Sequence, residues 1–178
     1  TTNIVKEGSF QSTDWLSGVN LTCALSEKFN IRAAASRTLN RPDMDDLSPQ
    51  QFQDQPNGST WTGNPHLRRS LITNYDLRFE AFPNIGEVFA VGGFYKRFAS
   101  PIELANFPGD VTKPANSDCG RNIGVELEAR TGLGRFSSAL RPFSANSNLS
   151  LVRSRIELKQ TTNLGNAEHS LVGQAPYM

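Results

Sequence analysis

The sequence predicts an all-β fold, an antiparallel transmembrane β-barrel fragment of about six to seven strands. Three observations support this fold class. Polar and apolar residues alternate with a period of two in successive segments, whereas helical spacing is rare. Each clear strand carries charged or amide side chains on its second face. Short and long connections alternate along the chain, as short periplasmic turns and long extracellular loops do in outer-membrane barrels.

The composition restricts the function classes. The 178 residues suit one domain, and no stretch approaches the ~18 consecutive apolar residues of a membrane helix. Eighteen Lys and Arg residues against 17 Asp and Glu residues leave no basic stripe for nucleic acid. A soluble antiparallel sheet with one buried face would show the same alternation, so the pattern alone leaves both interpretations open.

The first two strands are expected at residues 15–25 and 30–38. The second carries Ile31, Ala33 and Ala35 on one face and Arg32 on the other, and Arg37 then follows on the apolar face. A lipid-facing charge costs ~2–4 kcal/mol at the membrane midplane and little at the interface. Arg37 is therefore expected near a strand end, or covered by neighbouring protein. Residues 41–69 are rich in Pro, Asp, Gln, Asn and Gly, which predicts a long loop.

The middle of the chain predicts a second hairpin. In residues 70–83, one face carries Leu71, Tyr75, Leu77, Phe79 and Ala81, and the other carries Asn74, Asp76, Arg78 and Glu80. The "NIGE" segment is a tight turn of the kind that hairpins use. It leads to a strand at residues 88–104, whose faces stay unassigned because aromatic residues occur at both parities. A second long loop is expected at residues 101–120.

The last third of the chain predicts another hairpin. Residues 122–133 alternate cleanly, with Ile123, Val125, Leu127 and Ala129 opposite Glu126, Glu128 and Arg130. A short connection at 132–142 leads to a strand at 143–158. A third long loop is expected at 159–170, and residues 171–178 look like the opening of another strand.

Residues 16–49 resemble the barrel of TonB-dependent outer-membrane receptors. The resemblance is carried by a serine–arginine–threonine–x–x–arginine–proline run, Ser36 to Pro42, at the end of the second strand. Three further stretches match in the family's order: Gly63–Glu80, Phe94–Leu104 and Asn122–Arg130. The sequence departs from the family's pattern at residues 16–18, which lack the usual proline. It departs again at Cys23 and Ala35, where an aromatic residue is common.

The resemblance implies active transport, in which a receptor captures a scarce solute outside the cell and imports it with energy passed through a plug domain. The 178 residues hold nothing resembling that plug, so we expect residues 1–178 to be a partial barrel domain, the C-terminal part of a larger receptor. One alternative is a complete eight-stranded barrel in which residues 1–10 add a strand. Another is an outer-membrane binding or adhesion protein without transport.

The implied partners follow from this interpretation. They are outer-membrane lipid, the plug and remaining strands of the same receptor, TonB indirectly through the plug, and an unidentified small solute. No cofactor and no nucleic acid are expected, and the implied location is the bacterial outer membrane. Catalysis is not expected, because His66 and His169 each stand alone with no nucleophile or carboxylate at a catalytic spacing.

Two groups of candidate site residues emerge. The polar faces of the strands supply a lumen-facing set: Arg32, Asn74, Asp76, Arg78, Glu80, Glu126, Glu128 and Arg130. Within this set the connectivity predicts a cross-strand ion pair between Arg32 and Glu80. In an intact receptor these side chains would contact the plug or line the water-filled wall, and direct contact with a transported ligand is the alternative.

The first long loop supplies the second group: Phe52, Trp61, Asp43, Asp45 and Asp46. The aromatic side chains could stack on a ligand or pack the loop. The three acids could bind Ca²⁺, but they lack the full oxygen-rich loop of calcium motifs, so no metal site is assigned. Cys23 and Cys119 are expected on opposite sides of the membrane, too far apart for a disulfide.

Overall fold

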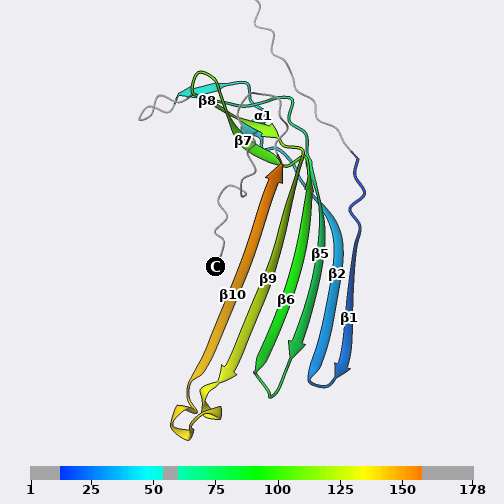
Figure 1. Cartoon of the computed structure of the whole chain (residues 1–178), viewed down its shortest axis with the longest axis vertical. Coiled ribbons are helices and arrows are strands. Elements are labelled where there is room, and N and C mark those ends of the chain that lie inside the picture. Colours follow the sequence, from blue (N-terminus) through cyan, green and yellow to red (C-terminus); the bar gives the residue numbers. More distant parts are fainter. Residues whose placement is uncertain (1–12, 54–59, 158–178) are drawn as a thin grey trace, which may run out of the picture.

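The structure, a computed structural model, describes residues 13–53 and 60–157. The strands in these ranges form a six-stranded sheet with the order β1-β2-β5-β6-β9-β10 and a four-stranded sheet with the order β3-β4-β8-β7. Figure 1 shows the six long strands side by side and the smaller sheet gathered at one of their ends.

The larger sheet is antiparallel throughout. Its strands are β1 (Gly18–Ser26), β2 (Phe29–Asn40), β5 (Ser70–Ala81), β6 (Val88–Ala99), β9 (Cys119–Gly132) and β10 (Ser144–Glu157). Each pairs antiparallel with its neighbours, and β1 and β10 form the two edges. The predicted all-β antiparallel fold is confirmed, with six long strands in the described ranges. No helix among the described residues is long and apolar enough to cross a membrane.

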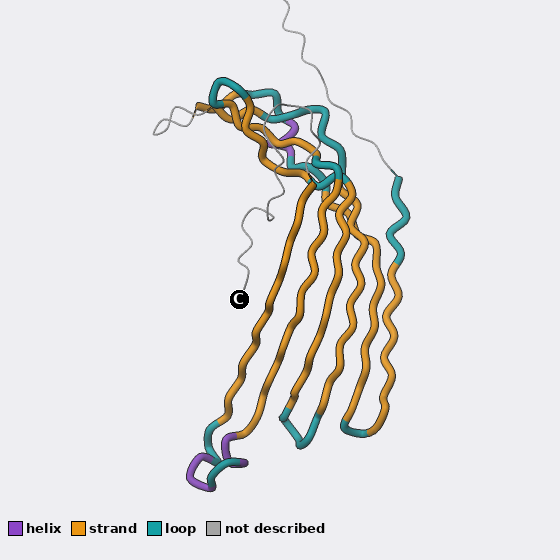
Figure 2. The backbone as a smooth tube through the Cα atoms, viewed as in Figure 1, coloured by secondary structure: helices purple, strands orange, loops and turns teal. Residues whose placement is uncertain are grey.

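The connections between these strands sort by length to the two ends of the sheet. Residues 27–28, 82–87 and 133–143 make short connections at one end, the turn end. The two long excursions, which join β2 to β5 and β6 to β9, lie at the other end, the loop end (Figure 2). The predicted alternation of short and long connections is therefore confirmed for the described part of the chain.

Residues 41–69 and 101–120, which were expected to be long loops, contain short elements of regular structure that the sequence prediction did not include. The first excursion contains α1 (Met44–Leu47), β3 (Gln51–Gln53) and β4 (Thr60–Thr62), and the second contains β7 (Ile102–Phe107) and β8 (Val111–Asn116). The parallel pair β4–β8 joins the two excursions into one sheet, the loop sheet β3-β4-β8-β7. The physical reason is that backbone N–H and C=O groups need partners, and the two excursions supply them to each other.

Three boundaries differ from the sequence prediction by about three residues or more. The first strand begins at Gly18 rather than at residue 15. The strand expected at 88–104 ends at Ala99, because Ser100 adopts a left-handed φ of 55° and Pro101 has no N–H for a ladder. Cys119 is the first residue of β9 rather than a loop residue. The third long loop, His169, the strand at 171–178 and residues 1–10 lie outside the described residues.

The pairing register divides the side chains of the larger sheet into two faces, because directly paired residues lie on the same side of an antiparallel ladder. One cross-strand row of the apolar face consists of Ile31, Phe79, Val91, Leu127 and Leu149. One row of the polar face consists of Asn30, Glu80, Ala90, Glu128 and Asn148. The register also assigns β6, whose Phe89, Val91 and Tyr95 lie on the apolar face while Phe94 and Phe98 lie on the polar face.

No described element covers the apolar face. Tyr75 is 52% exposed, and Phe79, Val125 and Leu127 are 45–46% exposed. The buried apolar side chains of the described residues include Leu67, Ala90, Pro114 and Ile156, and three of these lie at the loop end, where the excursions fold back. The larger sheet therefore does not bury its apolar side against a second layer, as a soluble sheet would.

Cys23 and Cys119 lie at opposite ends of the sheet. Cys23 is in β1 close to the turn end, opposite Ile31, and Cys119 pairs with Ala99 at the loop end. No disulfide joins them. A bridge requires Cα atoms within about 7 Å, which this placement does not allow.

Candidate functional site

A charged network crosses the polar face near its turn end. The Arg32 Nε donates to Glu80 at 2.8 Å, so the predicted ion pair between these residues is confirmed. The Arg78 Nε donates to the second Glu80 oxygen at 3.0 Å, and the Arg78 Nη2 donates to Glu128. Four members of the predicted lumen-facing set are thus joined across β2, β5 and β9.

The register explains why the network can form. Arg32 is directly opposite Arg78, and Glu80 lies two residues along β5, so the carboxylate accepts from both guanidinium groups. Between β5 and β9, β6 contributes Ala90 and Gly92. These small residues leave space for Arg78 to extend across β6. The link to Glu128 was not predicted, because sequence alternation alone does not show which side chains can reach across an intervening strand.

Burial differs strongly among the members of the network. The Glu80 side chain is 9% exposed, whereas Arg32 is 55% exposed. Both oxygens of the buried carboxylate have donors, as a buried charge requires. The network therefore holds the Glu80 carboxylate largely away from solvent and leaves Arg32 accessible to whatever occupies the polar side.

The rest of the predicted lumen-facing set lies on the polar face outside this network. Asn74 donates from its amide to Ser36 Oγ at 3.3 Å and to Thr38 Oγ1 at 3.1 Å, towards the loop end. Asp76, Glu126 and Arg130 are exposed. These three side chains remain available on the polar side, but the described structure does not bring them together.

The candidate ligand residues of the first excursion lie in or next to short elements. Asp43 occupies the N-cap position of α1 without a side-chain cap hydrogen bond, and Asp45 and Asp46 lie in its first turn. No group of three potential metal ligands is found within residues 13–53 and 60–157. Trp61 is half-buried in β4, where its backbone pairs with Phe52. The side chain of Phe52 lies outside the described part of the structure, and His66 is exposed.

The two excursions are joined by amide side chains as well as by the β4–β8 pair. The Asn116 amide donates to Arg68 O at 2.8 Å and to Ser100 O at 2.9 Å, while its oxygen accepts from Arg68 N at 2.7 Å. Asn64 donates to Pro114 O at 3.0 Å. The excursions thus form one unit at the loop end, and this unit was not visible in the sequence pattern.

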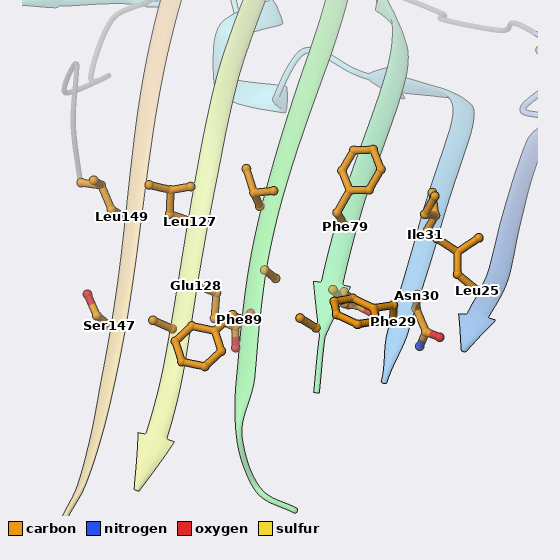
Figure 3. Close-up of a pocket in the computed structure, with 15 residues that line it drawn as sticks. Leu25, Phe29, Asn30, Ile31, Phe79, Phe89, Leu127, Glu128, Ser147 and Leu149 are labelled. Atoms are coloured by element: carbon orange, nitrogen blue, oxygen red, sulfur yellow. The ribbon is translucent and has the colours of Figure 1, made fainter. Parts of the chain in front are cut away.

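A broad groove of about 560 Å³ lies on the apolar face near the turn end. Residues of all six long strands line it, and Figure 3 shows two of the side-chain rows, with Phe29 and Phe89 in one and Ile31, Phe79, Leu127 and Leu149 in the other. A small-molecule site usually combines an enclosed apolar cavity with a few convergent polar groups. This groove is instead the open space between rows of an uncovered sheet.

The comparison with protein families matches residues 1–177 to the model described as TonB dependent receptor-like, beta-barrel. The chain belongs to the TonB-dependent receptor family. The match covers nearly the whole chain, which agrees with the six-stranded antiparallel sheet and with the long connections gathered at one of its ends. A search of curated proteins found no significant match.

Solved structures of other receptors share this fold. The siderophore receptor PirA from Pseudomonas aeruginosa matches with a TM-score of 0.62 at 17% identity, over 84% of this chain and 28% of that receptor. A mutant of the ferric enterobactin receptor PfeA from the same organism, in complex with enterobactin, matches with a TM-score of 0.61 at 18% identity, over 83% of this chain and 26% of that receptor. The TonB-dependent receptor chain thus spans little more than a quarter of the length of the solved receptors that it matches.

Proposed function

We propose that this TonB-dependent receptor chain forms part of the wall of an outer-membrane receptor that binds a scarce solute and imports it with TonB-coupled energy. Residues 1–178 would serve as one partial barrel domain. The observation that carries the proposal is the two-sided sheet, with an uncovered apolar face, a charged polar face and the described long excursions at one end.

The apolar face fits contact with membrane lipid. From the row of Phe29 and Phe89 to the row of Tyr75 and Tyr95 each strand advances six residues, about 20 Å at 3.3 Å per residue. Outer-membrane barrels present an apolar band ~25 Å tall, flanked by aromatic residues at both interfaces. The strands between the two sheet edges satisfy one another's backbone groups, as a lipid environment requires.

The polar face fits a water-filled interior. The network of Arg32, Arg78, Glu80 and Glu128 is a concentration of paired charge, which a lipid-facing surface would not tolerate near mid-membrane. In a TonB-dependent receptor the plug domain occupies this interior and relays energy from TonB. Three side chains of the polar face are accessible to such a partner: Arg32, which is half exposed, and Asp76 and Glu126, which are exposed.

The loop sheet fits solute capture at the extracellular side. The solved receptors with this fold are described as receptors for a siderophore and for ferric enterobactin. We therefore assign an iron chelate of siderophore type as the solute class. The candidate residues for contact with the solute in this region are Trp61 and the acids Asp43, Asp45 and Asp46.

Binding and uptake of a labelled ferric siderophore by whole cells test the proposal. Cells that produce the full-length gene product should accumulate the label, whereas a deletion strain or a strain without functional TonB should not. Binding without energy-dependent uptake would favour the adhesion or binding alternative. Full-length protein that does not fractionate with the outer membrane would contradict the proposal as a whole.

A matched pair of variants tests the role of the loop sheet. Trp61→Ala should weaken siderophore binding to cells, because Trp61 lies in the loop sheet at the loop end. Phe136→Ala is the control, since Phe136 is an exposed aromatic residue in the β9–β10 connection at the turn end. Equal binding by both variants, at equal levels of receptor in the outer membrane, would remove Trp61 from the proposed site.

A further inference from the structure

A row of arginines crosses the apolar face at its loop end. The register aligns Arg37 of β2, Thr73 of β5, Arg97 of β6, Arg121 of β9 and Arg155 of β10 in one cross-strand row. Arg153 lies two residues from Arg155 on β10, on the same face but opposite Ile123, in the next row towards the turn end. We call these five residues, Arg37, Arg97, Arg121, Arg153 and Arg155, the arginine row.

Four of these arginines, Arg37, Arg97, Arg121 and Arg155, lie immediately beyond the apolar band, and Arg153 lies at its edge. Tyr75 and Tyr95 occupy that edge row together with Arg153, and the two tyrosine rings stack with centroids 6.5 Å apart. Aromatic residues at this position mark the membrane interface in barrels of this type. At the interface a lipid-facing Arg costs only ~0–1 kcal/mol, so the arginines occupy a depth at which they are tolerated.

The arginine row differs from the arginines of the polar face in its partners. Arg32 and Arg78 bind carboxylates, whereas Arg37, Arg97, Arg121 and Arg153 are exposed and make no ion pair with any residue of the described ranges. Neighbouring strands are only ~4.8 Å apart, so the guanidinium groups of Arg97 and Arg121 repel each other. An external anion placed between them would remove this repulsion.

We propose that the arginine row binds the phosphate groups of phosphorylated glycolipid head groups in the outer leaflet of the membrane. The proposal rests on the proposed function, because it needs the apolar face to contact lipid. Charge complementarity favours this occupant. Arginine binds phosphate through two parallel hydrogen bonds, and basic clusters next to a membrane bind anionic head groups. A lipid whose chains lie along the apolar band presents its head group at the level of the row.

Binding of diphosphoryl lipid A by the purified full-length gene product tests the proposal, with enzymatically dephosphorylated lipid A as the comparison. We expect wild-type protein to bind the phosphorylated lipid at least about tenfold more tightly, a difference of about 1.4 kcal/mol. The variant R97Q/R121Q/R153Q should lose this preference. The control R41Q/R68Q/R141Q removes the same charge from exposed arginines elsewhere and should keep it.

Three outcomes would decide against the proposal. Equal binding of both lipids by wild-type protein, or an unchanged preference in R97Q/R121Q/R153Q, would overturn it. Competition by inorganic phosphate at concentrations equal to those of the lipid would show a free-anion site instead of a lipid site. Should the triple variant not fold, the comparison of the two lipids on wild-type protein still decides.

Incorporation into phosphatidylcholine vesicles separates this proposal from the proposed function. Protein that inserts into these vesicles but does not distinguish the two lipids would contradict only the lipid site. Protein that does not insert would contradict the membrane placement on which the proposed function also depends.

Discussion

Asn116 and Arg68 exchange two hydrogen bonds between the two long excursions. The Arg68 N–H donates to the Asn116 side-chain oxygen at 2.7 Å, and the Asn116 amide donates back to the Arg68 carbonyl at 2.8 Å. The same amide also donates to Ser100 O at 2.9 Å, next to the left-handed turn that ends β6. One side chain therefore joins the end of the first excursion to both ends of the second.

Replacing Asn116 by alanine should loosen the loop sheet without unfolding the long strands. The change removes three hydrogen bonds and leaves backbone groups of Arg68 and Ser100 unpaired, at a cost of about 1–3 kcal/mol. Hydrogen exchange in the full-length gene product should accelerate in residues 102–116 and stay unchanged in β2 and β5. The control Asn106→Ala removes one exposed hydrogen bond from Thr112 and should have a smaller effect. Equal exchange in both variants would show that Asn116 does not hold the excursions together.

Gly63 should tolerate no side chain. A Cβ at this position would lie within 3.0 Å of three backbone carbonyl oxygens, those of Asp45, Asp46 and Ser48. Gly63→Ala should therefore displace α1 and weaken the adjoining hydrogen bond from Asn64 N to Asp46 O, at a cost of about 1–3 kcal/mol. Gly132→Ala is the matched control, because no atom beyond its two chain neighbours lies within 4 Å of the corresponding Cβ. Proteolysis near residues 44–48 should increase in the first variant alone, and an unchanged pattern would contradict the predicted close packing.

The sequence was sufficient to predict the long strands because their polar and apolar residues alternate. On β5 and β9 the two faces differ at nearly every position, and the register confirms each assignment. On β6 alternation could not assign the faces. Phe94 lies on the polar face, where Gly124 of β9 leaves space for its ring, and Gly93 provides no side chain on the apolar face. Gly124 lets an aromatic side chain occupy the polar face, and Gly93 leaves a gap on the apolar face. The two faces of β6 therefore do not differ in polarity, which is the difference that face assignment from the sequence requires.

The loop sheet was not predicted because its strands are short and its key pairing is long-range. Only Thr60–Val111 and Trp61–Thr112 join the two excursions in parallel, and residues so far apart in sequence leave no local pattern. One signal was present. The "FPGD" segment before Val111 places Gly109 and Asp110 at positive φ, as expected of a tight turn between two strands. The link from Arg78 to Glu128 was missed for a similar reason, since it spans an intervening strand.

Removal of Arg78 should destabilise the barrel more than removal of Arg32. Arg78→Ala leaves Glu128 without its partner in the network and Glu80 with only the half-exposed Arg32, which should cost about 1–3 kcal/mol. Arg32→Ala leaves Glu80 paired with Arg78 and should cost about 0–1 kcal/mol. Guanidinium unfolding of the full-length gene product in detergent micelles, followed by tryptophan fluorescence, measures both. A larger loss for Arg32→Ala would show that the polar-face network is not centred on Arg78.

The turn end should loosen in acid through Glu87. This carboxylate accepts hydrogen bonds from Thr131 at 2.7 Å and from Asn84 at 2.6 Å, and it pairs with Arg135 at 3.6 Å. These contacts, first the Thr131 hydroxyl and then the Asn84 amide, hold the pKa of the Glu87 carboxyl below its ordinary value. The closed form thus binds a proton more weakly than the open form. The stabilisation is therefore fully present above the ordinary glutamate pKa of about 4.3 and is lost as the pH falls through the lower pKa of the closed form.

Glu87→Gln separates this titration from the general effect of acid. Glutamine keeps the size of the side chain but carries no charge, so the residues of the β9–β10 connection, 133–143, should exchange their amide hydrogens faster than in wild-type protein at neutral pH. As the pH falls below about 4.3, the wild-type rate should approach that of the variant, because the protonated carboxyl no longer attracts Arg135. Taking the ratio of the two rates at each pH cancels the intrinsic pH dependence of exchange. A ratio that stays constant from neutral pH into acid would show that Glu87 does not link the connection at residues 82–87 to the connection at residues 133–143.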